Sequence, residues 1–233
     1  MPWLGGLLLT LVLSVVCANT ARAQGMWVST PTGAFNVPVR SMQELKFTET
    51  VRQGFDFSCG SAALATLLTY HYDREISEFL VFKSMWENGN HEKIEKDGFS
   101  MLDMKRFLAS EGLSADGFSV DPSKIGEIGV AGIALLSETD SPHFVVIIGE
   151  QDGELLISDP ARGIWNMSTE ELGELWNGVF FVIRDQAKLA RANFNDSDAW
   201  ERRRWAPLGD ERMVDMIAPV GLELPLPTEF NAN

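Results

Sequence analysis

The sequence predicts an α+β protein with a helical N-terminal half packed on an antiparallel sheet. From residue 59 to residue 111, apolar residues recur every three or four positions, the period of a helix with one buried face. From residue 130 to residue 184 they form short β-branched or aromatic runs separated by turn residues. Helices first and strands second are typical of the α+β class. The 233-residue chain is 45% hydrophobic and 22% charged, which excludes disorder as its main state.

The first 23 residues have the pattern of a cleavable export signal. An apolar run from Leu4 to Cys17 is followed by small and polar residues and by the triplet Ala21-Arg22-Ala23. The run is shorter than the ~20 apolar residues that a transmembrane helix needs, and no later stretch approaches that length. We therefore predict a signal peptide over residues 1–23 and no integral membrane segment after its cleavage.

The charge and cysteine content narrow the classes of partner. The net charge is −14, which disfavours binding to nucleic acid and to anionic lipid and suits either a cationic substrate or simple solubility. Removal of the signal leaves Cys59 as the only cysteine, in a compartment where thiols are usually oxidised in pairs. No internal disulfide can form in the mature chain, so this thiol is either buried or used.

A polar lead-in over residues 24–44 precedes a domain that we place at residues 45–186. Within the domain, Gln53–Ser58 is predicted as a loop and is followed by a mostly buried helix that starts at Cys59. Its apolar face is formed by four residues at helical spacing, Leu64, Leu67, Leu68 and His71. This spacing assigns His71 to packing.

Two more helices are expected before the sheet. The first covers Glu75–Asn88, and the second starts after Ser100, whose hydroxyl can cap the backbone N–H of Asp103, and ends before Gly112. The large aromatic side chains of the domain are assigned to the core; they are Phe79, Trp86, Trp165 and Trp176.

The sheet is predicted from four short runs and is interrupted by one helix. A capping-box pattern, Ser168-Thr-Glu-Glu171, starts that helix. Beyond the domain, residues 187–233 form an expected C-terminal extension that is partly helical and then flexible. The four predicted strands are Val130–Leu136, Phe144–Gly149, Leu155–Ser158 and Val179–Arg184.

Four residues have the chemistry of a nucleophilic site. Cys59 lies where a loop meets a helix start, so free backbone N–H groups and the helix dipole favour its thiolate. His143 opens one predicted strand and Asp159 ends the next, so a hairpin can bring the imidazole next to an orienting carboxylate. Gln53, six residues before the cysteine, can donate an amide N–H to the oxyanion of an attacked carbonyl.

Each of these residues also has a purely structural interpretation. A lone cysteine is often a small buried hydrophobe, His143 can merely begin a strand, Asp159 can form a turn with the following proline, and Gln53 can cap the loop. Their occurrence together and in this order favours the catalytic interpretation. His91 lies in a polar turn, and no second cysteine accompanies it, so we predict no metal site and no cofactor.

The sequence resembles the C39 peptidases of the papain-like superfamily over roughly residues 45–186. The matching segments are Gln53-Gly-Phe-Asp-Phe-Ser-Cys59-Gly-Ser-Ala-Ala-Leu, Pro142-His143-Phe-Val-Val-Ile and Asp159-Pro-Ala-Arg-Gly163. The resemblance implies a papain-like fold with Cys59 as nucleophile, His143 as general base and acid, Asp159 as the orienting residue and Gln53 as the oxyanion donor. In such a site Trp165, which we assign to the core, has an alternative role: its side chain can shield the contact between His143 and Asp159.

The chain departs from many members of this family in two ways. Ser58 stands before the cysteine where many members have Asp, and the phosphate-binding loop of an ATP-driven exporter is absent from the sequence. With its export signal, the chain is more similar to stand-alone exported members, such as the peptidase of functional-amyloid secretion. This implies a periplasmic cysteine peptidase that cleaves after small residues, with a secreted or amyloid-forming polypeptide or a secretion-system component as its partner.

Two other functions are compatible with the same residues. Papain-like enzymes with this Cys–His–Asp order also act on other acyl donors, so a cell-wall amidase or acyltransferase is one alternative. The other is a peptide-binding module of a secretion system that keeps the groove but turns over slowly or not at all.

Overall fold

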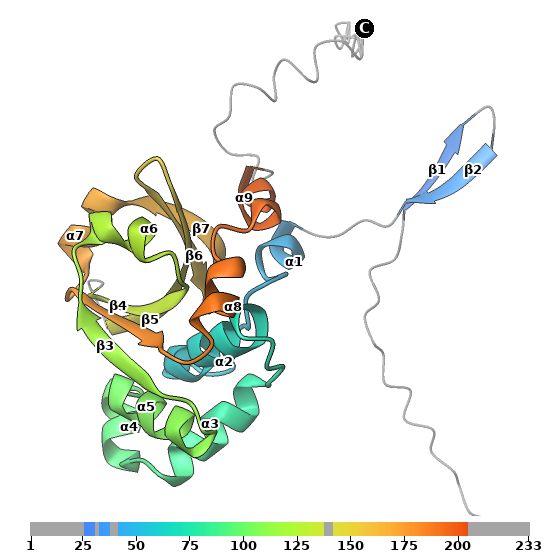
Figure 1. Cartoon of the computed structure of the whole chain (residues 1–233). Helices are drawn as coiled ribbons and strands as arrows, with labels where there is room; N and C mark the ends of the chain where they lie inside the picture. The colour runs from blue at the N-terminus through green and yellow to red at the C-terminus, as the bar shows by residue number, and fades with distance from the viewer. Residues whose placement is uncertain (1–25, 31–32, 38–41, 138–141, 205–233) are drawn as a thin grey trace, which may run out of the picture. The chain divides into compact units, whose positions relative to one another are not determined.

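The computed structural model describes residues 26–30, 33–37, 42–137 and 142–204. The chain divides into two compact units at residue 41, and each is described by itself (Figure 1). The predicted signal peptide lies outside the described residues, as does the end of the predicted C-terminal extension. Within the described ranges, no helix has both the length and the apolar character needed to cross a membrane.

The first unit contains a β-hairpin. Strands β1 (Met26–Thr30) and β2 (Gly33–Val37) pair antiparallel, with Met26 opposite Val37. The segment that we interpreted only as a polar lead-in therefore includes two strands.

The second unit has nine α-helices, one 3₁₀ helix and six strands within its described residues. In chain order they are α1 (Met42–Lys46), α2 (Cys59–His71), α3 (Glu78–Glu87), α4 (His91–Asp97), α5 (Met101–Ser110), β3 (Ala115–Ser119), the 3₁₀ helix η1 (Pro122–Lys124), α6 (Ile125–Ile128), β4 (Gly132–Ser137), β5 (Pro142–Gln151), β6 (Glu154–Asp159), β7 (Gly163–Ser168), α7 (Thr169–Leu175), β8 (Val179–Ile183), α8 (Ala187–Ala192) and α9 (Ser197–Arg204). Helices α2 to α5 precede all six strands, which confirms the predicted α+β class.

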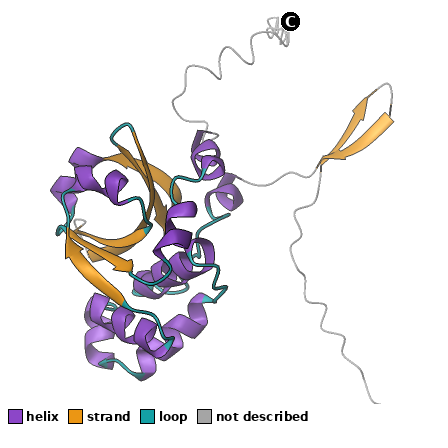
Figure 2. Cartoon of the chain, viewed as in Figure 1, coloured by secondary structure: helices purple, strands orange, loops and turns teal. Residues whose placement is uncertain are grey.

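The six strands form one antiparallel sheet in the order β3-β8-β4-β5-β6-β7. The sheet is strongly curved, and α3, α4 and α5 gather at one end of the unit (Figure 2). The four predicted strands correspond to β4, β5, β6 and β8. The two strands that the sequence analysis missed, β3 and β7, are the edges of the sheet. Edge strands are less buried and tolerate residues such as Asp116, Gly117 and Asn166, so their apolar pattern is weak.

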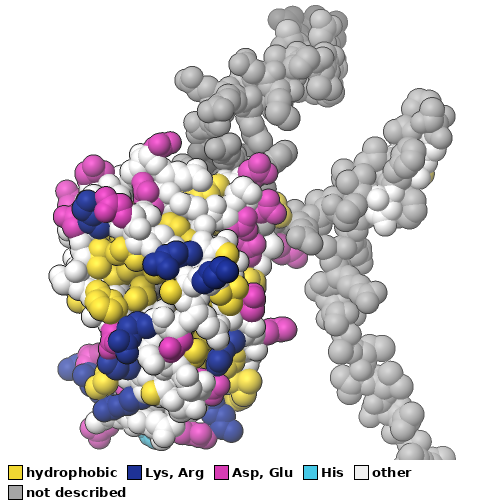
Figure 3. All heavy atoms as spheres, viewed as in Figure 1, with side chains coloured by type: hydrophobic (Ala, Val, Ile, Leu, Met, Phe, Trp, Pro, Cys, Tyr) yellow, Lys and Arg dark blue, Asp and Glu magenta, His cyan; other side chains and the backbone are white. Residues whose placement is uncertain are grey.

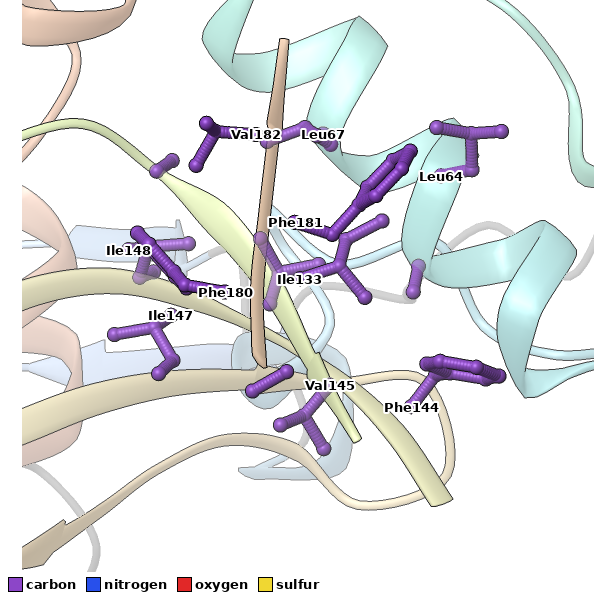
Figure 4. Close-up of a cluster of buried hydrophobic side chains, with 14 of the residues drawn as sticks. Leu64, Leu67, Ile133, Phe144, Val145, Ile147, Ile148, Phe180, Phe181 and Val182 are labelled. Carbon is purple, nitrogen blue, oxygen red and sulfur yellow. The ribbon is translucent and has the colours of Figure 1, made fainter. Parts of the chain in front are cut away.

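A large part of the core lies between α2 and the sheet. Helix α2 packs on β4, β5 and β6 on one side and on α3 and α5 on the other, and every residue from Cys59 to Leu68 is buried. At Gly60 an added Cβ would lie 3.0 Å from Met104 Cε and 3.2 Å from Phe99 Cβ, so glycine permits this close approach. Figure 4 shows the side chains of Leu64, Leu67, Ile133 and Phe181 in this layer.

Side-chain caps fix the starts of three helices near the sites predicted from sequence. Ser77 caps α3, and both Ser100 and Ser168 form complete capping boxes, with Asp103 and Glu171 respectively. The predicted helix starts at Ser100 and Ser168 are therefore confirmed. The predicted second helix begins three residues later than expected, at Glu78.

The assignment of Phe79 to the core is wrong. Its side chain is 64% exposed, whereas Trp176 is buried and Trp86 and Trp165 are partly buried against the core. Val81 and Met85, four residues apart, form the buried face of α3. Phe79 precedes Val81 by two residues, which places it about 200° around the helix from that face.

The segment between α8 and α9 is hydrogen-bonded to the sheet at a β-bulge in β5 between Ile147 and Gly149. The backbone N–H of Asn195 donates to Ile148 O at 3.0 Å, and its side-chain Oδ1 accepts from the backbone N–H of Glu150 at 2.6 Å and from Trp200 Nε1 at 3.3 Å. Trp200 is buried. The helical part of the predicted extension is thus packed onto the sheet.

Candidate active site

Cys59 is the first residue of α2, and a tight loop holds it there. Ser58 immediately precedes the helix; its Oγ accepts from the backbone N–H of Phe55 at 3.1 Å and donates to Phe55 O at 3.0 Å. Ser61 Oγ donates to Ser58 O at 2.9 Å. The side chain of Cys59 is only 7% exposed, and it is a free thiol. The thiol therefore lies at the electropositive end of a well-packed helix.

His143 and Asp159 meet at one end of the sheet. His143 is the second residue of β5, and Asp159 is the last residue of β6, the neighbouring antiparallel strand. The Nε2 atom of His143 lies 2.8 Å from Asp159 Oδ1. Cys59 is close enough to the imidazole for its hydrogen bond and charge to contribute to the raised pKa of His143. Because Nε2 faces the carboxylate, Nδ1 is the ring nitrogen that remains to exchange a proton with the thiol.

The electrostatic environment of His143 and Asp159 favours the charged form of each side chain. Burial alone would lower the pKa of His143, but hydrogen bonds and charge interactions with Asp159 and Cys59 raise it to about 10. Burial would raise the pKa of Asp159, but the hydrogen bond and charge of His143 and the backbone N–H groups of Ala161 and Arg162 hold it below its usual value. The imidazolium and the carboxylate therefore stabilise one another.

The Asp159 carboxylate is completely buried and has several donors. Besides the His143 contact, Oδ1 accepts from the backbone N–H groups of Ala161 at 2.7 Å and Arg162 at 3.1 Å. Oδ2 accepts from Trp165 Nε1 at 3.3 Å and lies 3.8 Å from Arg162 Nε. The turn that starts at Asp159 thus surrounds its carboxylate with donors.

Gln53 is fixed next to this turn through its backbone, because its N–H donates to Pro160 O at 3.1 Å. Its side-chain Nε2 donates to Phe55 O at 3.1 Å, within the loop before the cysteine. The Oε1 atom is buried and has no hydrogen-bond partner among the described residues. The structure joins His143 to Asp159 by a hydrogen bond, places Cys59 close enough to influence the pKa of the imidazole, and holds Gln53 in the loop before Cys59.

Two polar contacts fasten the segment that leads to Gln53. Thr50 Oγ1 and Ser158 Oγ, both buried, lie 2.7 Å apart, and the backbone N–H of Val51 donates to Thr66 Oγ1 at 2.9 Å. Thr66 belongs to α2 and Ser158 to β6, so the segment is anchored to both elements that position the site.

A groove of about 850 Å³ opens beside Cys59. Lys93, Lys96, Glu95 and Asp97 of α4 contribute charges of both signs to it. On the face shown in Figure 3, charged side chains of both signs are likewise interspersed with apolar ones. The groove therefore combines an apolar lining with charges of both signs next to the thiol. Its apolar lining consists of Phe57, Phe99, Met101, Leu102, Leu135, Pro142 and Phe144.

An aromatic cluster supports the loop from the side of α3. The Phe82 ring lies 5.3 Å from that of Phe55 and 5.9 Å from that of Phe57, measured between ring centroids. Trp86 stacks on Phe82 at 5.9 Å and on His91 at 4.4 Å. His91 is therefore part of this stack. The buried His71, whose pKa burial lowers to about 4, lies in the core as predicted.

Two features of the site were not predicted from the sequence. They are the two hydrogen bonds between Ser58 and Phe55, and the two backbone N–H groups that donate to Asp159. The signal for the donors was present, because an Asp that starts a turn commonly accepts from backbone N–H groups two and three residues on. The hydrogen bond from Trp165 could not be found this way, since it depends on the pairing of β7 with β6.

The α+β fold, with a cysteine at a helix start and a histidine on the adjoining sheet, defines the class of the protein as papain-like. Residues 48–188 match the peptidase C39 family, so the chain belongs to that family and is a cysteine-type peptidase.

Two relatives agree with this assignment, and a solved structure has a similar fold. The chain is 33% identical over 180 residues to the "Probable functional amyloid protease FapD" of Pseudomonas aeruginosa, covering 77% of this chain and 80% of that protein. It is 34% identical over 176 residues to the protein of the same name in Pseudomonas fluorescens, covering 75% and 78%. The fold is similar to the peptidase domain of Streptococcus ComA, a bi-functional ABC transporter, with a TM-score of 0.50, 22% identity and coverage of 57% of this chain and 96% of that domain.

Proposed function

We propose that the chain hydrolyses polypeptides by a Cys–His–Asp mechanism. The Cys59 thiolate attacks a peptide carbonyl carbon, and the amine leaves with a proton from the His143 imidazolium, which gives an acyl-enzyme. His143, now neutral, takes a proton from water, whose oxygen attacks the thioester; the carboxylic acid product leaves and the thiolate–imidazolium pair is restored. Asp159 holds Nε2 and stabilises the imidazolium in both steps.

The observation that supports this mechanism most is the position of His143 between its two partners. The Nε2–Oδ1 distance is 2.8 Å, and the hydrogen bond and charge of Cys59 contribute to the raised pKa of the same imidazole, which supports a role for Nδ1 toward the thiol. We assign the oxyanion contact to Gln53. Its Nε2 carries two N–H bonds and donates to Phe55 O at 3.1 Å and to Asp56 O at 3.5 Å; the longer of these contacts is the one that a substrate oxyanion would replace.

We further propose that the substrate is an exported polypeptide and that cleavage follows small residues. The relatives are named as proteases of functional amyloid, which supports a secreted or amyloid-forming protein, or a component of its secretion system, as the partner. The signal-like residues 1–23 support export to the periplasm. The described domain then acts as the peptidase unit over residues 45–186, with residues 187–233 as an extension.

The direct test compares the exported polypeptides of cells carrying the wild type with those of cells carrying Cys59→Ala. Mass spectrometry of periplasmic and secreted fractions should show a polypeptide that is cut only by the wild type, with Gly or Ala before the cut. A peptide-library profile that prefers bulky residues at both positions would contradict the small-residue proposal. Fractionation, with N-terminal sequencing of the purified chain, tests export and cleavage near residue 23.

Two further assays separate peptide hydrolysis from the alternatives. Iodoacetamide should alkylate Cys59 rapidly at neutral pH in a His143-dependent manner; slow labelling would indicate a binding module with no activated thiol. Purified murein should remain uncut, whereas release of murein fragments by the wild type and not by Cys59→Ala would identify a cell-wall amidase.

A further inference from the structure

The two oxygens of the Asp159 carboxylate have unequal support. Oδ1 accepts three hydrogen bonds, including the one from His143 at 2.8 Å. Among the described residues Oδ2 accepts one, from Trp165 Nε1 at 3.3 Å, and its ion pair with Arg162 Nε is longer, at 3.8 Å. Because the carboxylate is fully buried, bulk water cannot readily replace a lost donor at Oδ2. The indole N–H therefore holds Oδ2, whereas the backbone N–H groups of Ala161 and Arg162 hold only Oδ1.

Strand pairing explains why Trp165 reaches this oxygen. Trp165 of β7 is directly opposite Ile157 of β6, and Asp159 lies two residues beyond Ile157. Residues directly opposite each other, and residues two apart on one strand, share a face of the sheet. Trp165 and Asp159 are therefore diagonal neighbours on one face. The Arg162 guanidinium lies 5.6 Å from the Trp165 ring centroid, a cation–π contact with the same indole.

We propose that Trp165 is a positioning residue for catalysis, which acts by holding Oδ2 of Asp159 so that Oδ1 stays aligned with Nε2 of His143. This inference rests on the proposed Cys–His–Asp mechanism. Without the indole N–H, the carboxylate can rotate about its Cβ–Cγ bond, and the hydrogen bond to the imidazolium becomes longer and less linear. The imidazolium that forms in each catalytic step is then less stabilised, as when a group that orients a histidine ligand is removed.

The test is Trp165→Phe, which keeps an aromatic ring and removes the N–H. Its matched control is Trp200→Phe, because Trp200 is a buried tryptophan whose Nε1 likewise donates to a side-chain oxygen at 3.3 Å, that of Asn195 beside the bulge of β5. For each full-length protein we would measure the iodoacetamide alkylation rate of Cys59 from pH 5 to 10, the melting temperature, and kcat and KM on a peptide selected from the library.

In Trp165→Phe we expect alkylation at pH 6 to slow about fivefold to tenfold, and the difference from the wild type to shrink as the pH approaches 10, where the wild-type imidazolium itself begins to lose its proton. We expect kcat to fall about tenfold with KM within twofold. Trp200→Phe should leave the pH profile and kcat unchanged even if it melts lower. In an Asp159→Asn background, Trp165→Phe should slow alkylation at pH 6 by less than twofold, because the two residues act through one contact.

Other results would overturn the proposal. If Trp165→Phe lowers only the melting temperature and leaves the pH profile and kcat unchanged, Trp165 has a packing role and the mechanism stands without it. If its effect persists in full in the Asp159→Asn background, it does not act through that carboxylate. If wild-type alkylation does not depend on His143, the proposed mechanism fails and the inference fails with it.

Discussion

His143 Nε2 and Asp159 Oδ1 form a buried contact of 2.8 Å, in which the Asp159 side chain has no exposed surface and the His143 side chain is 14% exposed. A charged pair in such a place is strongly coupled, since removal of one member leaves the other desolvated and unbalanced. The pair also adjoins Cys59, so the same contact links fold stability to the reactivity of the thiol.

Asp159→Asn should lower kcat by about 10²–10⁴ and change KM little. The amide is neutral, so it no longer balances the imidazolium, and its NH₂ group can face Nε2 in place of an acceptor. Steady-state kinetics on a peptide substrate measure the effect. An Asn fills this role in some papain-like enzymes, which favours the lower end of the range. Unchanged kcat would reduce Asp159 to a turn former.

The stability conferred by His143 should depend on pH in a defined window. Its pKa is raised from 6.5 to about 10 in the folded state, so the charged form stabilises the fold. This contribution is complete below pH 6.5 and is lost as the pH rises through 10. We expect the difference in free energy of unfolding between the wild type and His143→Gln to shrink steadily from pH 6.5 to 10 in urea titrations.

His71 provides the control for that experiment. Burial lowers its pKa to about 4, so it is neutral in the folded protein, and its contribution to stability is lost as the pH falls from 6.5 through 4. The difference in free energy of unfolding between the wild type and His71→Asn should therefore stay constant from pH 8 to 10. A parallel decline for both variants would mean that a global change, and not His143, causes the loss.

Gln53→Glu should lower kcat by about 10²–10³, the range for one oxyanion donor, because it removes the N–H groups while keeping the size of the side chain. Ser58→Ala is the matched control: it breaks two contacts of the same loop with Phe55 and removes no group that faces the oxyanion. We expect Ser58→Ala to lower the melting temperature and to leave kcat nearly unchanged. If Gln53→Glu behaves the same way, Gln53 only caps the loop.

Cys59→Ala should abolish turnover and leave the fold nearly intact. The site is the first residue of α2 and is well packed, so a small side chain fits, whereas the reaction needs a thiolate. Circular dichroism should superimpose on that of the wild type while peptide hydrolysis falls to background. Cleavage by a purified variant would remove the peptidase assignment of this residue.

Gly163→Ala should destabilise the turn that follows Asp159 by about 2–5 kcal/mol. Gly163 has φ +80°, and an added Cβ would lie 2.6 Å from the backbone oxygen of Lys46 in α1. Gly178→Ala is the control, because its φ is +77° but no atom lies within 4 Å of its Cβ position. It should cost only about 1 kcal/mol in urea unfolding. Equal losses would show that backbone strain alone matters.

The sequence by itself determined the order of the main elements and indicated the candidate site residues. Helical spacing after Cys59, the capping patterns at Ser100 and Ser168, and the apolar runs of the inner strands are local signals, because the residues that form each pattern lie within one or two turns or on one strand. The order of Cys59, His143 and Asp159, with their flanking residues, was enough to indicate the family.

The tertiary structure decided what depends on long-range pairing. The edge strands β3 and β7 lack a strong apolar pattern, since each is paired on one side only, and the exposure of Phe79 follows from which face of α3 meets the core. The indole bond to Asp159 exists because β7 pairs with β6 in one register. Such contacts join residues through the packing of whole elements, so no local pattern in the sequence specifies them.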